Sequence, residues 1–307
     1  MTVGDDFFIV IRAAGDRTEA LCQKLAEAQG APERVVVIRE APFARAVRRS
    51  FEIGLEQGPR WTFCLDADSL LAPGAISRCL EELDALPETV FRASPRGAWR
   101  FHRAMLTLGL HAYRTSLLKE ALSLLDTETP SLKPESAVRR AMQQAGHDCV
   151  ILETVAGVHE YGLSYGDIYR RMCLRACKAT QREYALLLHL AGRARREDAE
   201  YRVVYRALRD ARLRPLSHHG TDALDEEEVR KVVHKLGLAE KPPLPPETGF
   251  EFVTEAIERF ETAPAAREWE AYFLEHVALK DPPRGPAEDY AHARGGLFRL
   301  WLWLTGR

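Results

Sequence analysis

The 307-residue chain has no CxxC pair, and its six cysteines are scattered along its length. This pattern does not suit a disulfide framework and fits the reducing cytoplasm better. The chain also has no run of the roughly 18 apolar residues that a membrane-spanning helix needs. Its first residues, MTVGDDFFIVIR, lack both the basic region and the long apolar region of a signal peptide. We therefore expect a cytoplasmic location.

An excess of charge of either sign is missing too. The 43 lysines and arginines nearly balance the 45 aspartates and glutamates, so no overall field attracts the protein to nucleic acid or to an anionic membrane. Any phosphate binding must therefore come from local groups. With 46% hydrophobic residues, a chain of this length can form a sizeable core and two domains.

The first part of the chain alternates strand and helix signals. Compact apolar or β-branched runs predict strands at residues 7–12, 34–38 and 61–65. Asp16 and Glu19, at capping-box spacing, predict a helix that Gly30 can close, and helical periodicity from Phe43 predicts a second that stops at Gly58. These units predict a doubly wound parallel sheet, whose ligand crevice lies beyond the carboxyl ends of the strands.

Two aspartates follow the third predicted strand, in the stretch WTFCLDADSLLAPGAI. Side chains two apart on an extended segment point to the same side, so Asp66 and Asp68 can share one hard target. A divalent cation with a nucleoside diphosphate is such a target, and it would keep both carboxylates ionised. The alternative is that Asp68 and Ser69 merely cap a helix around residues 73–83.

With their flanks, these residues resemble the core of the GT-A glycosyltransferases, particularly the inverting glycosyltransferase family 2. The resemblance rests on four segments in the family's order, which together span residues 6–161. They are FARAVRRSFEIGLEQG, FCLDADSLLAPGAI, GLHAYRTSLLKEAL and KPESAVRRAMQQAGHDCVILETVAGVHEY.

The resemblance implies the fold and the activity. Residues 1–161 would form a Rossmann-like GT-A domain that binds a nucleotide-sugar, and residues 162–307 a helical C-terminal domain. The implied enzyme is a metal-dependent, hexosyltransferase-like glycosyltransferase. It would move a sugar from a nucleoside-diphosphate sugar to an acceptor hydroxyl with inversion. The QxxRW pattern of processive members is missing, so we expect one or a few sugars to be added.

The resemblance also implies a metal site. Asp68 and His159 would hold the ion, and Asp66 would contact the ribose or reach the ion through water. Imidazole and carboxylate together suit Mn²⁺ better than Mg²⁺, which prefers oxygen ligands. The alternative for His159 is a structural histidine that bonds to Tyr161 or to a backbone group.

Glu135 stands at the start of a predicted helix, between Pro134 and Ser136. A carboxylate there can stabilise the helix dipole by about 0.3–1 kcal/mol or can act as a general base. The resemblance implies the second role, deprotonation of the acceptor hydroxyl. The chain departs from the family here, because Ser136 stands where the family often has a second acid.

The donor nucleotide would lie along the ends of the first two strands. The resemblance implies that the end of the first strand surrounds the base and ribose and that an acid contacts the base. It also implies that arginines lie near the phosphates, where a guanidinium offsets the charge of a leaving diphosphate. A solvated, salt-bridged surface is the alternative for most of the arginines. The implied donor-binding residues are Arg12, Ala13, Ala14, Glu40, Arg45, Asp66, Ala67, Arg170 and Arg171.

After residue 162 strand signals fade and helical periodicity dominates, with KPPLPPETG as a stiff connector. The chain ends in GGLFRLWLWLTGR, which could be a buried helix, a homodimer contact or a weak anchor at the inner face of the membrane. The acceptor could be a glycan, a lipid-linked sugar or a small molecule. Two rival functions are a sugar nucleotidyltransferase, for which RAAGDRT is only a faint phosphate loop, and a non-catalytic nucleotide-sugar binder or scaffold.

Overall fold

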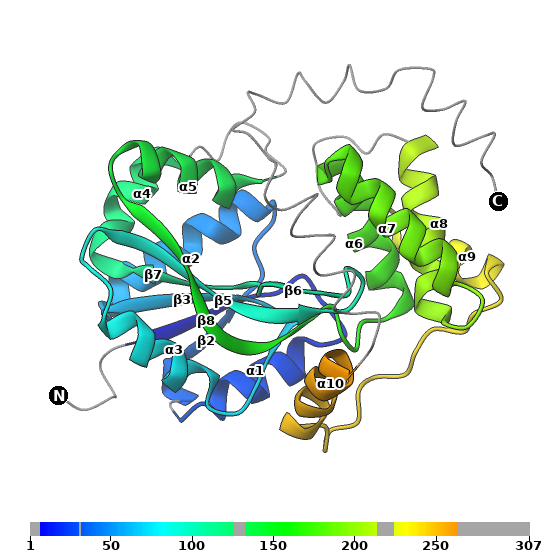
Figure 1. Cartoon of the computed structure of the whole chain (residues 1–307), viewed down its shortest axis with the longest axis horizontal. Helices are drawn as coiled ribbons and strands as arrows, with labels where there is room; N and C mark the ends of the chain where they lie inside the picture. The colour runs from blue at the N-terminus through cyan, green and yellow to red at the C-terminus, as the bar shows by residue number, and fades with distance from the viewer. Residues whose placement is uncertain (1–6, 31, 126–132, 214–223, 263–307) are drawn as a thin grey trace.

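The computed structural model describes residues 7–30, 32–125, 133–213 and 224–262, and a mixed β-sheet lies at its centre (Figure 1). Within these residues the sheet has eight strands in the order β2-β1-β3-β7-β5-β8-β4, and β6 pairs with β5 outside this path. The strands are β1 (Phe7–Arg12), β2 (Val35–Ile38), β3 (Trp61–Asp66), β4 (Ser69–Leu71), β5 (Val90–Trp99), β6 (Ala104–Thr107), β7 (Leu110–Arg114) and β8 (Asp148–His159).

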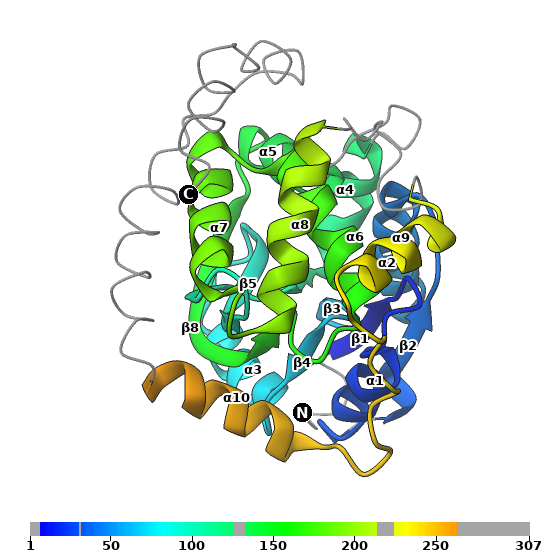
Figure 2. The ribbon, with the colours of Figure 1, turned by 90° about the vertical axis from the view of Figure 1, so that its right-hand side faces the viewer.

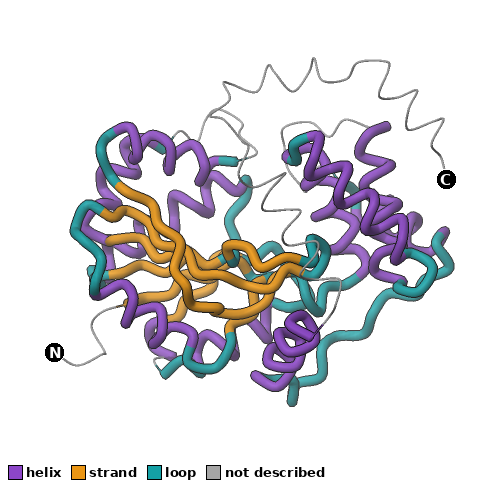
Figure 3. Tube along the Cα trace, in the orientation of Figure 1, coloured by secondary structure: helices purple, strands orange, loops and turns teal. Residues whose placement is uncertain are grey.

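Helices cover both faces of this sheet (Figure 3). α2 (Phe43–Gln57), α4 (Leu118–Leu124) and α5 (Pro134–Gln144) pack on one face. α1 (Glu19–Glu27), α3 (Ala75–Asp84) and α10 (Phe250–Thr262) pack on the other face. A third core lies to one side, mostly within α6 (Tyr165–Lys178), α7 (Gln181–Ala194), α8 (Ala199–Leu213) and α9 (Glu226–Lys235). The predicted α/β fold followed by helices is therefore confirmed.

The sheet is mixed: the three strands for which a parallel sheet was predicted are parallel, and the later strands add antiparallel pairs. β1 is parallel to β2 and β3, but β7 is antiparallel to both β3 and β5. β5 and β6 are joined by only the four residues 100–103, and so short a connection allows an antiparallel return alone. β7 continues that return after β6. The apolar pattern of each strand did not encode its direction.

Most predicted elements near the site have the expected bounds. β1 covers the predicted residues, and α2 begins at Phe43 and ends before Gly58, whose φ of 63° is favourable for glycine. The capping box at Asp16 is wrong, because α1 begins at Glu19 without a side-chain cap and Asp16 bonds to Arg171. Asp68 does not cap a helix either, since β4 follows it and α3 starts only at Ala75.

Polar contacts hold the α6–α9 bundle against the sheet. Ser164 and Asp167 form a capping box at the start of α6, and the Glu240 carboxylate accepts the N–H groups of the next two residues, Tyr165 and Gly166, at 2.6 and 2.9 Å. Asp167 also accepts the backbone N–H of Arg17, which follows β1. The N-terminus of α6 is therefore fixed from both sides.

Residues after α9 return to the first part of the chain. The segment 241–249 runs past α1, where Lys24 donates to the backbone oxygens of Pro246 and Thr248. α10 then packs Val253 and Phe260 into the core formed with α1 and α3 (Figure 2). The division after residue 161 stays a prediction.

The described helices include none long and apolar enough to cross a membrane. The predicted dimer or membrane contact through residues 295–307 lies outside the described residues.

Candidate functional site

The carboxyl ends of β1 and β3 place Arg12 beside Asp66, which is its partner in the parallel register. The Arg12 side chain is 2% exposed and donates to Asp66 Oδ1 through Nε at 3.0 Å and to Glu135 Oε1 through a terminal nitrogen at 2.6 Å. The Tyr113 hydroxyl on β7 donates to the same Glu135 oxygen at 2.8 Å. The predicted base and the first aspartate of the DAD sequence therefore meet on one buried arginine.

A second cluster surrounds Asp68, in the turn between β3 and β4. Ser69 on β4 pairs with His159 on β8, and the backbone N–H of Glu160 donates to the Asp68 carbonyl at 3.0 Å. Asp68, His159 and Glu160 can each offer one ligand atom, and these atoms all lie within 4.8 Å of one another. Glu160 has a φ of 65°, a conformation that costs a non-glycine residue roughly 1–3 kcal/mol. That backbone geometry places its carboxylate in the cluster.

The donor atoms of this cluster fit a divalent cation. Asp68 Oδ1, His159 Nδ1 and Glu160 Oε2 are buried and have no hydrogen-bond partner among the described residues, whereas Asp68 Oδ2 is paired with Arg171 at 2.5 Å. Buried acceptors without a donor are rare, and a bound ion is one standard explanation. Two carboxylates and an imidazole suit Mn²⁺. The cluster brings together Asp68 and His159, two of the predicted site residues, with Glu160, while Asp66 lies against Arg12.

Two arginines of α6 face the cluster. Arg171 forms ion pairs with Asp68 Oδ2 and with Asp16 Oδ1, both at 2.5 Å. Arg175 donates to Glu160 Oε1 at 2.8 Å. The positive charge of α6 therefore balances acids that follow β1, β3 and β8 in the chain.

An aromatic ring fixes the orientation of the histidine. The Trp99 ring of β5 stacks on His159, with ring centroids 4.0 Å apart and an interplanar angle of 16°. The Arg175 guanidinium lies 4.6 Å from the Trp99 ring, so the arginine contacts both the carboxylate and the stacked pair. Burial alone would lower the pKa of His159, but Asp68 and Glu160 outweigh it and raise that pKa.

The carboxylates of the site have divergent acidities. Burial would raise the pKa of Glu135, but Arg12 and then His111 outweigh it and lower the value to about 2. Burial raises the pKa of Asp66 to about 6 even though Arg12 opposes this, and Asp68 adds repulsion. Arg12 thus keeps Glu135 ionised and makes it a weak base while the ion pair lasts.

The remaining predicted residues are placed differently. Ala13 and Ala67 are buried and bond through their backbones, whereas Ala14, Glu40 and Arg45 are exposed near the ends of β1 and β2. Arg170 turns toward Asp167 at 3.6 Å and does not join the Asp68 cluster. The site residues predicted from the sequence did not include Glu160, Trp99 or Arg175. The His-Glu pair at the end of β8 was a signal for Glu160, but no local pattern marked the other two.

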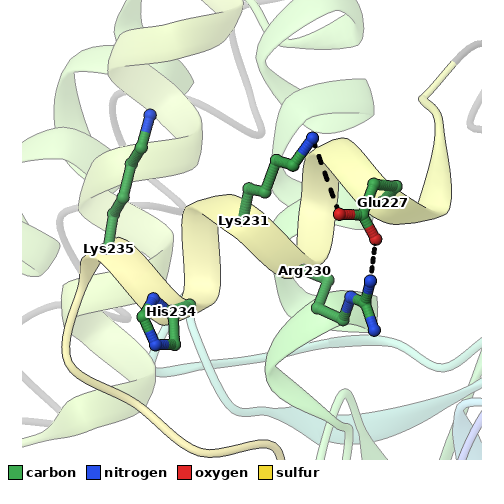
Figure 4. Close-up of a pocket in the computed structure, with 5 residues that line it drawn as sticks. All are labelled: Glu227, Arg230, Lys231, His234 and Lys235. Atoms are coloured by element: carbon green, nitrogen blue, oxygen red, sulfur yellow. Dashed lines mark hydrogen bonds and ion pairs between the residues drawn. The ribbon is translucent and has the colours of Figure 1, made fainter.

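A hollow lies along α9 (Figure 4). Its lining residues all come from that helix, and Arg230 and Lys231 pair there with Glu227. None of the predicted site residues lines it.

No family model matches the chain, and no curated protein matches its sequence. Similar solved structures include both glycosyltransferases and nucleotidyltransferases. The mannosyltransferase PcManGT from Pyrobaculum calidifontis, in complex with GDP-Man and Mn²⁺, is 13% identical, with 88% of this chain and 84% of that chain covered and a TM-score of 0.38.

Two solved structures of shorter chains have similar sequence identities and TM-scores. A glycosyltransferase involved in glycosylation of the major capsid of PBCV-1 is 13% identical, with 51% of this chain and 95% of that chain covered and a TM-score of 0.37. A cytidylyltransferase from Leptospira borgpetersenii serovar Hardjo-bovis is 13% identical, with 64% and 95% covered and a TM-score of 0.38. TM-scores this low support no inference of shared activity, so a functional proposal must rest on the site itself.

Proposed function

We propose that the protein is a metal-dependent glycosyltransferase of the GT-A type, which moves a sugar from a nucleoside-diphosphate sugar to an acceptor hydroxyl. The observation that supports this most directly is the Asp68–His159–Glu160 cluster. Each of its three residues has a buried ligand atom without a hydrogen-bond partner among the described residues, and the cluster lies just beyond the carboxyl end of β3, where ligands of open α/β sheets bind.

Asp68, His159 and Glu160 would hold Mn²⁺ or Mg²⁺. When bound, the ion would neutralise charge on the departing diphosphate. Arg171 adds positive charge at the same place, because its guanidinium already lies against Asp68. Asp66, which is 30% exposed, is free to contact the ribose on its open side.

Glu135 would accept the proton of the acceptor hydroxyl, whose oxygen attacks the anomeric carbon from the face opposite the diphosphate. This direct displacement inverts the configuration. A carboxylate with a pKa of about 2 is a poor base. Proton transfer to Glu135 therefore requires that its ion pair with Arg12 weakens in the complex with both substrates.

The two parts of the chain would have separate tasks in this proposal. Residues 1–161 would form the catalytic domain, and the helices after residue 161 would supply Arg171 and Arg175 and help to select the acceptor. The protein would be cytoplasmic and would add one or a few sugars.

The first test is thermal stability with a panel of nucleoside diphosphates and their sugars, with and without Mn²⁺. A ligand that binds only the folded state raises Tm. We expect one nucleotide to raise Tm in a Mn²⁺-dependent way, and Asp68→Ala to abolish that shift. Asp84→Ala is the matched control, since Asp84 forms a surface pair with Arg60.

The reaction product separates the rival functions. A glycosyltransferase releases a nucleoside diphosphate, whereas a sugar nucleotidyltransferase consumes a nucleoside triphosphate and releases pyrophosphate. A protein that binds the nucleotide-sugar without turnover in the presence of any acceptor would be a scaffold. If no nucleotide shifts Tm under any metal condition, the glycosyltransferase proposal is wrong.

A further inference from the structure

Two arginines flank the contact between Tyr113 and Glu135. Arg92 on β5 is the antiparallel partner of Tyr113 on β7, so the two side chains lie on the same face of the sheet. Arg139 lies four residues after Glu135 on α5, which places both on one side of that helix. A strand and a helix therefore each bring one guanidinium toward Glu135.

Neither arginine has an acidic partner in the part of the chain that the structure describes. Within the described residues no ion pair joins Arg92 or Arg139 to a carboxylate, and the Nε atom of each is buried without a hydrogen-bond partner. The arginines at the donor side differ in this respect, because Arg12, Arg171 and Arg175 all pair with carboxylates. Partly buried positive charge without a counter-charge is costly, so a site of this kind favours an anionic ligand.

The pKa shifts of Arg139 and of the nearby His111 indicate that positive charge is concentrated here. Burial lowers the pKa of Arg139, and repulsion from Arg92 lowers it further. His111 on β7 donates to or accepts from Ser94 at 2.9 Å, and burial followed by repulsion from Arg92 lowers its pKa to about 3. The ring is therefore neutral at pH 7, and the positive charge of this region comes from the arginines.

This face of the sheet is open beyond α5. In the pairing of β5 with β8, Cys149 is opposite Arg92 and Ile151 is opposite Ser94. Ile151 is 60% exposed although it is a large apolar residue. A ligand bound by the arginines thus has access from solvent and an apolar surface beside it.

We propose that Arg92 and Arg139 bind a phosphate monoester group of the acceptor substrate. Two guanidinium groups match the two negative charges and the several oxygens of such a group, whereas one carboxylate would leave a positive charge unbalanced. In the proposed function the donor diphosphate lies at the Asp68 cluster, where Arg171 and Arg175 supply the positive charge. A phosphate held by Arg92 and Arg139 would therefore belong to the molecule whose hydroxyl Glu135 activates. This inference rests on the proposed glycosyltransferase function.

The test measures the Tm shift caused by inorganic phosphate, with acetate and chloride at equal ionic strength as comparisons. The variants are Arg92→Gln/Arg139→Gln and, as a matched loss of two charges, Arg49→Gln/Arg259→Gln, whose arginines pair with acids on the surfaces of α2 and α10. We expect phosphate to stabilise the wild type and the control equally, and its apparent affinity to fall at least tenfold in Arg92→Gln/Arg139→Gln. If the double variant does not fold, the single variants Arg92→Gln and Arg139→Gln replace it.

Several results would overturn the proposal. One is that phosphate does not raise the Tm of the wild type. Another is that phosphate raises the Tm of the double variant as much as that of the wild type, as expected if it binds only at the donor site. An equal shift by acetate would indicate a carboxylate ligand in place of phosphate. Each of these outcomes removes the phosphate assignment.

A second arm, a nucleoside diphosphate with Mn²⁺, keeps the two proposals distinguishable. If the donor site is separate, the nucleotide shift is the same in Arg92→Gln/Arg139→Gln as in the wild type. Loss of that shift in the double variant would assign the arginines to the donor and overturn the acceptor site. If the wild type itself shows no nucleotide shift, the glycosyltransferase proposal fails, while the phosphate arm still reports whether the arginines bind an anion.

Discussion

At the scale of single residues, Arg12 determines how the site can work. It bonds to Asp66 and Glu135 at once and is almost fully buried. It thereby holds Asp66 and Glu135 close to each other. The same contact lowers the pKa of Glu135, so under the proposed mechanism Glu135 can act as a base only when a substrate competes for Arg12.

Replacement of Glu135 by glutamine tests its role as the base. The amide keeps the size of the side chain but cannot take a proton, so we expect the rate of transfer to fall about 10²- to 10⁴-fold. Donor affinity, measured by the Mn²⁺-dependent Tm shift, should stay unchanged. Glu153→Gln on the exposed part of β8 is the control. Unchanged turnover in Glu135→Gln would mean that another group is the base.

At the scale of elements, the strands and helices of the first 84 residues could largely be predicted from sequence. Their apolar runs and glycine stops are local, as the bounds of β1 and α2 show. The local sequence pattern did not predict the directions of strands β5 to β7, and it did not predict the short strand β4. β4 exists because Ser69–Leu71 pairs with Gly157–His159, residues far away in the chain.

Gly157 makes that pairing possible. A Cβ atom at this position would lie 2.0 Å from the backbone oxygen of Leu70, so Gly157→Ala forces β4 away from β8. Overpacking typically costs about 1–3 kcal/mol, and here it acts two residues from His159. We expect denaturant unfolding to show a loss of stability and Mn²⁺ binding to weaken.

Gly192→Ala is the matched control for this prediction. Gly192 lies inside α7, and its added Cβ would meet only the Tyr205 ring, at an ordinary distance of 3.6 Å. Replacement of a helix-interior glycine by alanine should stabilise the protein by roughly 0.5–1 kcal/mol. If Gly157→Ala and Gly192→Ala changed the free energy of unfolding equally, β4 could move away from β8 without loss of stability.

At the scale of the whole molecule, the site depends on the helical part of the chain. The sequence indicated helices there, but not that α6 would face the Asp68 cluster. That placement comes from tertiary contacts such as Glu240 with the N-terminus of α6. The sequence grouped Arg170 with Arg171, and helix geometry separates them, because neighbouring residues on a helix point about 100° apart.

This arrangement predicts that Arg171 competes with a cation for Asp68. Its terminal nitrogen lies 2.5 Å from Asp68 Oδ2, which is a proposed metal ligand. Arg171→Gln leaves a carboxylate that is 1% exposed without its main counter-charge, a loss of about 3–5 kcal/mol for a buried pair. We expect a lower Tm without metal, and a larger rise in Tm on addition of Mn²⁺ than the wild type shows, because the ion replaces the missing charge.

Arg170→Gln provides the comparison for this prediction. It makes the same chemical change one residue earlier on α6, where the side chain faces Asp167. We expect its response to Mn²⁺ to match that of the wild type. If Arg171→Gln shows no enhanced response while the protein remains folded, Asp68 is not a metal ligand, and the Asp68–His159–Glu160 cluster is a structural ion-pair network. The helical part would then stabilise the sheet through Arg171 without contributing to donor binding.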